Sequence, residues 1–169
     1  MMKKETDIKA WIKKIQDSKD LDVDLSIDED LSIALMNLIS LEEHFYFSAM
    51  KTNNQKYLDM LNSTRELRKI LLKRIVKDPD GEEWCISKHL LAASMRLIEV
   101  GTKELAKNNK EEANRLFKYA FDLYSLFFAI NMKLVGVKEL MQNPETKNTM
   151  NIMGKFSAAI SKILDCCRE

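Results

Sequence analysis

Apolar residues recur along most of this chain with the three- and four-residue spacing of an α-helix. One stripe reads Leu, Leu, Leu, Glu, Phe, Ala at positions 31, 35, 38, 42, 45 and 49, and a second reads Leu, Leu, Arg, Arg, Leu, Ile at positions 58, 61, 65, 68, 72 and 75. Residues with this spacing share one helix face, so each stripe predicts a helix with one side in a core. The charged residues inside the stripes need an explanation.

Turn-forming residues separate the stripes. They are Asn53-Asn54, Asp78-Pro79-Asp80-Gly81, Asn108-Asn109 and Asn143-Pro144, and they predict helices over about 30–51, 54–77, 82–107 and 110–141. Short connections favour antiparallel neighbours, so we predict an all-α fold with an up-down four-helix bundle core. Three pairs fit N-terminal caps of these helices: Ser26 with Glu29, Asp80 with Glu83, and Asn109 with Glu112.

Two further segments flank this core. Residues 5–19 predict an amphipathic helix, and the acidic run over 20–30, with an aliphatic residue at every second position, predicts an extended linker. A C-terminal helix is predicted over 147–167. We therefore expect a single helical domain over 1–169, in which 1–25 form the N-terminal helix and acidic linker and 26–141 form the bundle core.

The composition agrees with a helical protein of the cytoplasm. Only 4 Gly and 2 Pro are present, which favours long helices over a turn-rich β fold. The net charge of +1 creates no field that would attract nucleic acid or an anionic membrane. The chain contains no run of 18 apolar residues, so the sequence predicts no membrane span. The first residues do not have the pattern of a secretory signal. Three cysteines, two of them adjacent at 166 and 167, make no disulfide framework and favour a reducing compartment.

The charged residues within the stripes have two interpretations. Arg65 and Arg68 lie three apart on one helix face, and Glu42 occupies the inward position of the preceding helix. Arginine pairs readily with carboxylates through two hydrogen bonds, which indicates an internal ion-pair network. The alternative is a pocket for a small anion or nucleotide, lined by Arg65, Arg68 and Arg96.

Cys85 and His89 lie four apart on one helix face and form a candidate metal site. Thiolate and imidazole are both ligands of divalent metals such as zinc, which takes four ligands in structural sites. The remaining ligands would come from other acidic or imidazole side chains: Glu42, Glu43, His44 and Glu99. The structural alternative is a small buried thiol and a hydrogen-bonded core histidine. A ferritin-like di-metal site is excluded, because Leu41 and Ile86 stand where its Glu-x-x-His motif needs carboxylates.

The helix predicted over 110–141 is apolar on more than one side, which is typical of a central helix or an oligomer interface. Its aromatic residues have no basic residues between them from Lys118 to Lys133, which argues against single-stranded nucleic-acid binding. Tyr124 and Asn131 lie seven apart and share a face. We expect them to complete the polar cluster, or a ligand site, by hydrogen bonding to Glu42 or His89.

Three strings resemble those of small uncharacterised helical proteins from archaea and some bacteria: Leu41-Glu42-Glu43-His44, Trp84-Cys85-Ile86-Ser87-Lys88-His89-Leu90-Leu91 and Arg96-Leu97-Ile98-Glu99-Val100-Gly101. The resemblance implies a helical class and carries no catalytic residue over. The chain also contains no Gly-rich phosphate loop, no His-Glu-x-x-His and no Gly-x-Ser-x-Gly. The sequence thus favours a non-enzymatic module that associates with itself or another protein. A metal-binding bundle and an Arg-lined anion pocket stay as alternatives.

Overall fold

The computed structural model describes residues 25–137, together with residues 13, 154, 157–158 and 160–161. Over residues 25–137 the chain forms α-helices and no strand: α2 (Ser26–Thr52), α3 (Lys56–Ile75), α4 (Glu83–Ala106) and α5 (Lys110–Asn131). The predicted all-α fold is confirmed. The predicted N-terminal helix, the first part of the acidic linker, Cys166 and Cys167, and most of the predicted C-terminal helix lie outside the described residues.

The helix ends follow local signals in most places. Asn53 ends α2 in the left-handed conformation, with φ of 51°, as asparagine readily does. Before α4, the backbone N–H of Asp80 donates to Glu83 Oε2 at 3.0 Å, which is one half of the predicted cap. At α2 the cap prediction was wrong. Leu25 occupies the N-cap position without a side-chain hydrogen bond, and Ser26 already lies in the helix.

Helix α5 ends at Asn131, well before the predicted end near Met141. Lys133 takes a left-handed conformation with φ of 56°, and the N–H of Leu134 bonds back to the carbonyl of Ala129 at 3.0 Å. This closing turn is the kind that glycine usually makes, so a lysine at this place gave no stop signal. Lys133 is also tied to the start of α4, since its Nζ donates to Glu83 Oε2 at 2.6 Å.

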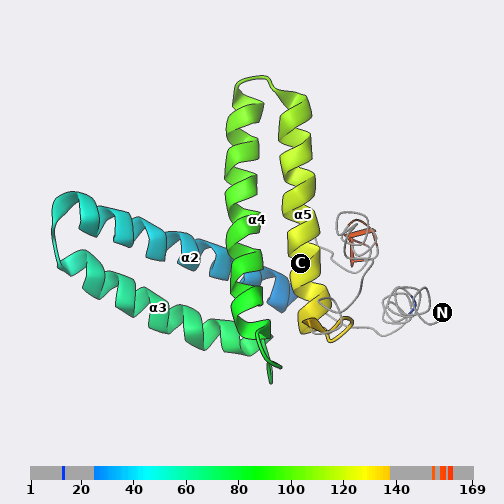
Figure 1. Ribbon diagram of the computed structural model, residues 1–169, viewed down its shortest axis with the longest axis horizontal. Coiled ribbons are helices and arrows are strands. Elements are labelled where there is room, and N and C mark those ends of the chain that lie inside the picture. The colour runs from blue at the N-terminus through cyan, green and yellow to red at the C-terminus, as the bar shows by residue number, and fades with distance from the viewer. Residues whose placement is uncertain (1–12, 14–24, 138–153, 155–156, 159, 162–169) are drawn as a thin grey trace.

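The four helices form two antiparallel hairpins that cross steeply (Figure 1). Helix α2 packs on α3, helix α4 packs on α5, and α2 also contacts α4. We call the α2–α3 pair the first arm and the α4–α5 pair the second arm. The second arm crosses the first near the N-terminal half of α2, so the distal half of α2 extends beyond the crossing.

The hydrophobic core lies where the arms meet. Its fully buried side chains come from all four helices and include Leu35, Leu72, Leu91, Phe127 and Phe128. Such burial stabilises by roughly 25 cal/mol per Å² of apolar surface. Among the described helices, none is long and apolar enough to cross a membrane.

Candidate interaction surface at the corner between the arms

One stripe along α2 is buried in its first half and exposed in its second half. Positions 29, 32, 36, 39, 43, 46 and 50 alternate spacings of three and four and therefore lie on one side of the helix. The first four, Glu29, Ser32, Met36 and Ile39, are buried. Ser32 marks the covered half, since its Oγ lies 2.6 Å from the Tyr124 hydroxyl of α5. Beyond the crossing, the second arm no longer covers this side.

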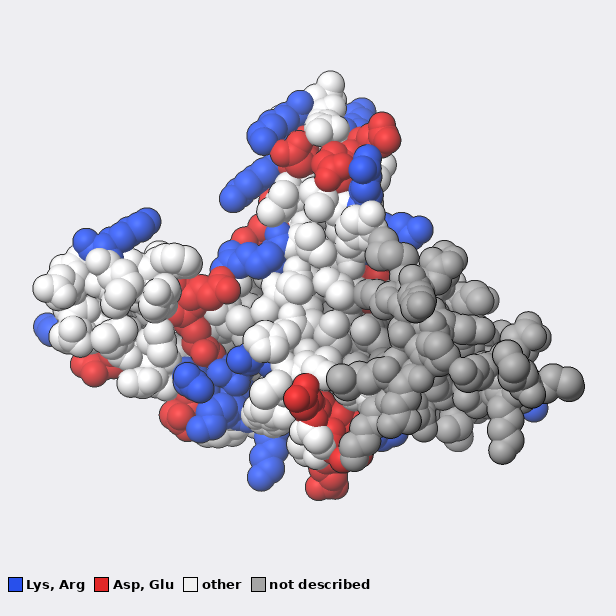
Figure 2. All heavy atoms as spheres, viewed as in Figure 1, with Lys and Arg blue, Asp and Glu red and all other residues white. Residues whose placement is uncertain are grey.

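The uncovered half carries large apolar side chains. Tyr46, Phe47 and Met50 are 49%, 56% and 58% exposed, and the two aromatic rings meet edge to face with centroids 5.2 Å apart. Single exposed apolar residues are ordinary, but a group of aromatic and methionine side chains on one face is typical of a contact surface. Figure 2 shows that the distal part of the first arm is largely uncharged on the face in view. We call Glu43, Tyr46, Phe47, Met50 and Lys51 the distal α2 face.

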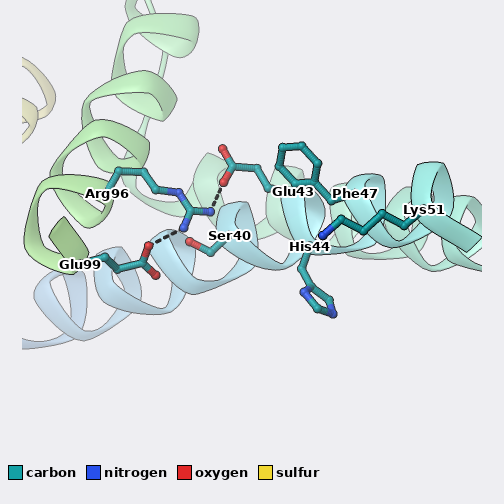
Figure 3. A pocket seen from close by; sticks show the side chains of 7 residues that line it. All are labelled: Ser40, Glu43, His44, Phe47, Lys51, Arg96 and Glu99. Atoms are coloured by element: carbon teal, nitrogen blue, oxygen red, sulfur yellow. Dashed lines mark hydrogen bonds and ion pairs between the residues drawn. The ribbon is translucent and has the colours of Figure 1, made fainter. Parts of the chain in front are cut away.

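A groove of about 720 Å³ lies at the corner between the arms. We call it the corner groove, and its lining is Ser40, Glu43, His44, Phe47 and Lys51 of α2 with Arg96 and Glu99 of α4 (Figure 3). The Arg96 side chain reaches from α4 toward Glu43, whereas the imidazole of His44 points away from Arg96. The corner groove is therefore continuous with the distal α2 face, because both contain Glu43, Phe47 and Lys51.

Arg96 joins the two arms at this corner. Its Nη2 donates to Glu43 of α2, and its Nη1 donates to Glu99 of its own helix at 2.5 Å. These hydrogen bonds, first to Glu43 and then to Glu99, raise the pKa of Arg96 above its ordinary value. All three side chains are well exposed, so the ion pairs add little stability. Their effect is to hold two carboxylates and one guanidinium at the corner.

Arg68 is held inside the first arm by Glu42. Arg68 Nε donates to Glu42 Oε1 at 2.7 Å, and Nη2 donates to Oε2 at 3.2 Å. Arg65, one turn earlier, is exposed although the stripe predicted an inward position. The three arginines predicted to line one anion pocket therefore lie in different surroundings: Arg68 against Glu42, Arg96 at the corner, and Arg65 at the surface.

The residues predicted as metal ligands are also spread over the molecule. Cys85 and His89 are exposed on α4, and His44 is exposed on α2. Glu42 pairs with Arg68, and Glu99 pairs with Arg96. Within the part of the chain that the structure describes, no group of three or more His, Cys, Asp or Glu side chains could hold a metal ion.

Tyr124 and Asn131 link helices through serines. The Tyr124 hydroxyl lies 2.6 Å from Ser32 Oγ of α2, and Asn131 Nδ2 donates to Ser87 Oγ of α4 at 3.0 Å. The sequence predicted Glu42 or His89 as their partners, whereas these contacts are made to the buried serines Ser32 and Ser87. The Tyr124 contact joins the two arms, and the Asn131 contact joins the two helices of the second arm. Neither contact lies in the corner groove.

Sequence reasoning named Glu43, His44, Arg96 and Glu99 as candidate site residues, and it missed Ser40, Phe47 and Lys51 of the corner groove. One signal was present in the chain, because the stripe from Ser32 to Met50 keeps its spacing without a break. That spacing is the same whether the stripe is covered or exposed, so it could not show where the covering helices end.

No family model matches this chain, and neither the curated proteins nor the solved structures searched gave a match.

Proposed function

We propose that this protein is a non-enzymatic interaction module whose contact surface is the distal α2 face. The observation that carries the proposal is the half-exposure of Tyr46 and Met50 on a stripe that is buried earlier in the same helix, with the exposed Phe47 next to them. Such a stripe is suited to packing against another helical surface. We also propose that the protein works in a reducing cytoplasm, consistent with its cysteine content.

The free energy gained when a partner covers this surface supports the proposal. An aromatic side chain buries about 150–250 Å² when fully covered, and Tyr46 and Phe47 each keep about half of that exposed. At roughly 25 cal/mol per Å², covering one of them would contribute about 2 kcal/mol to association. Aromatic and methionine residues are also the types most enriched at protein contacts.

Photo-crosslinking in living cells tests the proposal. A photoreactive amino acid at position 47 should give covalent adducts with a protein partner of any kind. The matched control is position 70, because Ile70 is 66% exposed. It lies two residues from buried Arg68 and Leu72, so it points away from the packed side of α3. Adducts at 47 and none at 70 are expected. Equal labelling at both positions, or none at 47, would overturn the proposal.

A further inference from the structure

We infer that the occupant of the distal α2 face is a second copy of this chain, packed antiparallel about a two-fold axis at Phe47. This inference rests on the proposed function and names its partner. In the resulting dimer, Glu43 of each copy lies opposite the partner's Lys51. The tip of each first arm then enters the corner groove of the other copy.

The register follows from three positions on one helix row. Glu43, Phe47 and Lys51 are spaced four apart, so they lie one above another on the same side of α2. Reversing the helix about Phe47 exchanges positions 43 and 51. Acid then meets base at both ends, and the two phenyl rings meet at the centre. A two-fold contact must be self-complementary in this way. A parallel pairing would instead oppose Glu43 to Glu43.

The charges of the corner and the tip also match. At the corner, Glu43 and Glu99 share the single guanidinium of Arg96, so these three groups carry one net negative charge. Exposed Lys51 and Lys56 lie close to the turn at Asn53, where the first arm ends. In the antiparallel register the partner's Lys51 reaches Glu43, so opposite charges meet at both ends of the contact.

The exposed area bears on whether a dimer can form. Stable complexes cover about 800 Å² per partner. The exposed parts of Tyr46, Phe47 and Met50 supply roughly 300 Å² of that area, and the tip and the corner groove of each copy add to it. We expect a weak dimer, because interfaces of this size extend to micromolar affinity at their weak end.

Analytical ultracentrifugation of the full chain tests this register by charge reversal. Glu43→Lys alone and Lys51→Glu alone each oppose like charges in the homodimer, so each should weaken it by roughly tenfold or more. An equimolar mixture of the two variants opposes unlike charges at both ends, so a mixed dimer should form. The double variant Glu43→Lys/Lys51→Glu should also recover the wild-type dimer. Circular dichroism on each variant confirms folding, which matters because Glu43 also binds Arg96.

The outcomes separate the register, the second copy and the proposed function. Recovery in the mixture supports the two-fold register. Single variants that dimerise as well as the wild type would overturn the register. A wild-type chain that stays monomeric at several hundred micromolar would overturn the second copy as the occupant. If position 47 still gives adducts with another protein in cells, only this inference fails; if position 47 gives none, the proposed function fails as well.

Discussion

Arg68 of α3 and Glu42 of α2 hold the first arm together through two parallel hydrogen bonds, Nε to Oε1 at 2.7 Å and Nη2 to Oε2 at 3.2 Å. The Arg68 side chain is only 4% exposed and that of Glu42 is 16% exposed. Removing two charges from water costs free energy that their attraction only partly returns. Loss of one partner therefore destabilises the fold strongly, whereas replacement of both partners by apolar residues costs little.

Arg68→Met should therefore destabilise the protein by about 3 kcal/mol, because it leaves the Glu42 carboxylate without its partner. Adding Glu42→Leu should recover most of that loss, because an apolar pair fills the space without a buried charge. Urea unfolding followed by circular dichroism measures both variants. Arg65→Met is the matched control on exposed surface and should change stability by about 0.5 kcal/mol or less. A double variant as unstable as Arg68→Met would contradict this account.

Gly101 allows α4 and α5 to approach closely. A Cβ at this position would lie 2.6 Å from Cε1 and 2.8 Å from Cδ1 of Phe117. Alanine is intrinsically better than glycine inside a helix by about 1 kcal/mol, but the collision with the ring should outweigh this gain. We expect Gly101→Ala to lower the free energy of unfolding by about 1–2 kcal/mol.

The sign of that effect should reverse when the ring is removed. In a Phe117→Ala background, Gly101→Ala should raise the free energy of unfolding by up to about 1 kcal/mol, since only the helix preference is left. Thermal and urea unfolding of the four proteins of this cycle give the coupling directly. Stabilisation in both backgrounds would show that the ring moves aside at no cost.

Two buried serines on facing helices differ in their hydrogen bonding. Ser94 Oγ donates to the carbonyl of Ala120 at 2.8 Å, whereas Ser125 Oγ is buried with no hydrogen-bond partner among the described residues. Ser94→Ala should cost about 1 kcal/mol, and Ser125→Ala should be neutral or stabilising, because it removes an unpaired hydroxyl. Differential scanning calorimetry measures the stability of both variants. A larger loss of stability for Ser125→Ala than for Ser94→Ala would contradict the prediction.

The carboxylate of Glu104 accepts hydrogen bonds from Lys107 Nζ at 2.8 Å and from Asn109 Nδ2 at 3.0 Å. These two contacts, Lys107 before Asn109, lower the pKa of Glu104 below its ordinary value. A lowered pKa in the folded state favours folding above the unfolded-state pKa, and this contribution is lost as the pH falls through the folded-state value.

NMR titration of the Glu104 side chain should show this shift directly. The pH midpoint of this titration should rise in Lys107→Ala. It should rise by less in Asn109→Ala, because the Lys107 hydrogen bond is the larger cause of the lowered pKa. A midpoint that stays unchanged in both variants would show that neither hydrogen bond holds the proton affinity down.

Local signals in the sequence predicted the helices and most of the turns between them. Asn53 and Asn108 adopt left-handed conformations, with φ of 51° and 63°, at the two predicted Asn-Asn turns. The end of α5 could not be predicted, because a lysine at position 133 makes the closing turn and is held there by Glu83, 50 positions away. The pairing of Glu42 with an arginine followed from the stripes, since both lie at inward positions of neighbouring helices.

What the sequence determined by itself, over residues 25–137, is the four helices, because the backbone hydrogen bonds and turns that define them involve residues a few positions apart. What only the tertiary structure decided is which part of the α2 stripe is covered. That depends on how steeply the second arm crosses the first, and side chains distant in sequence, such as Leu35 and Phe127, set this crossing through their packing. The same spacing of residues thus became core at Met36 and exposed contact surface at Met50.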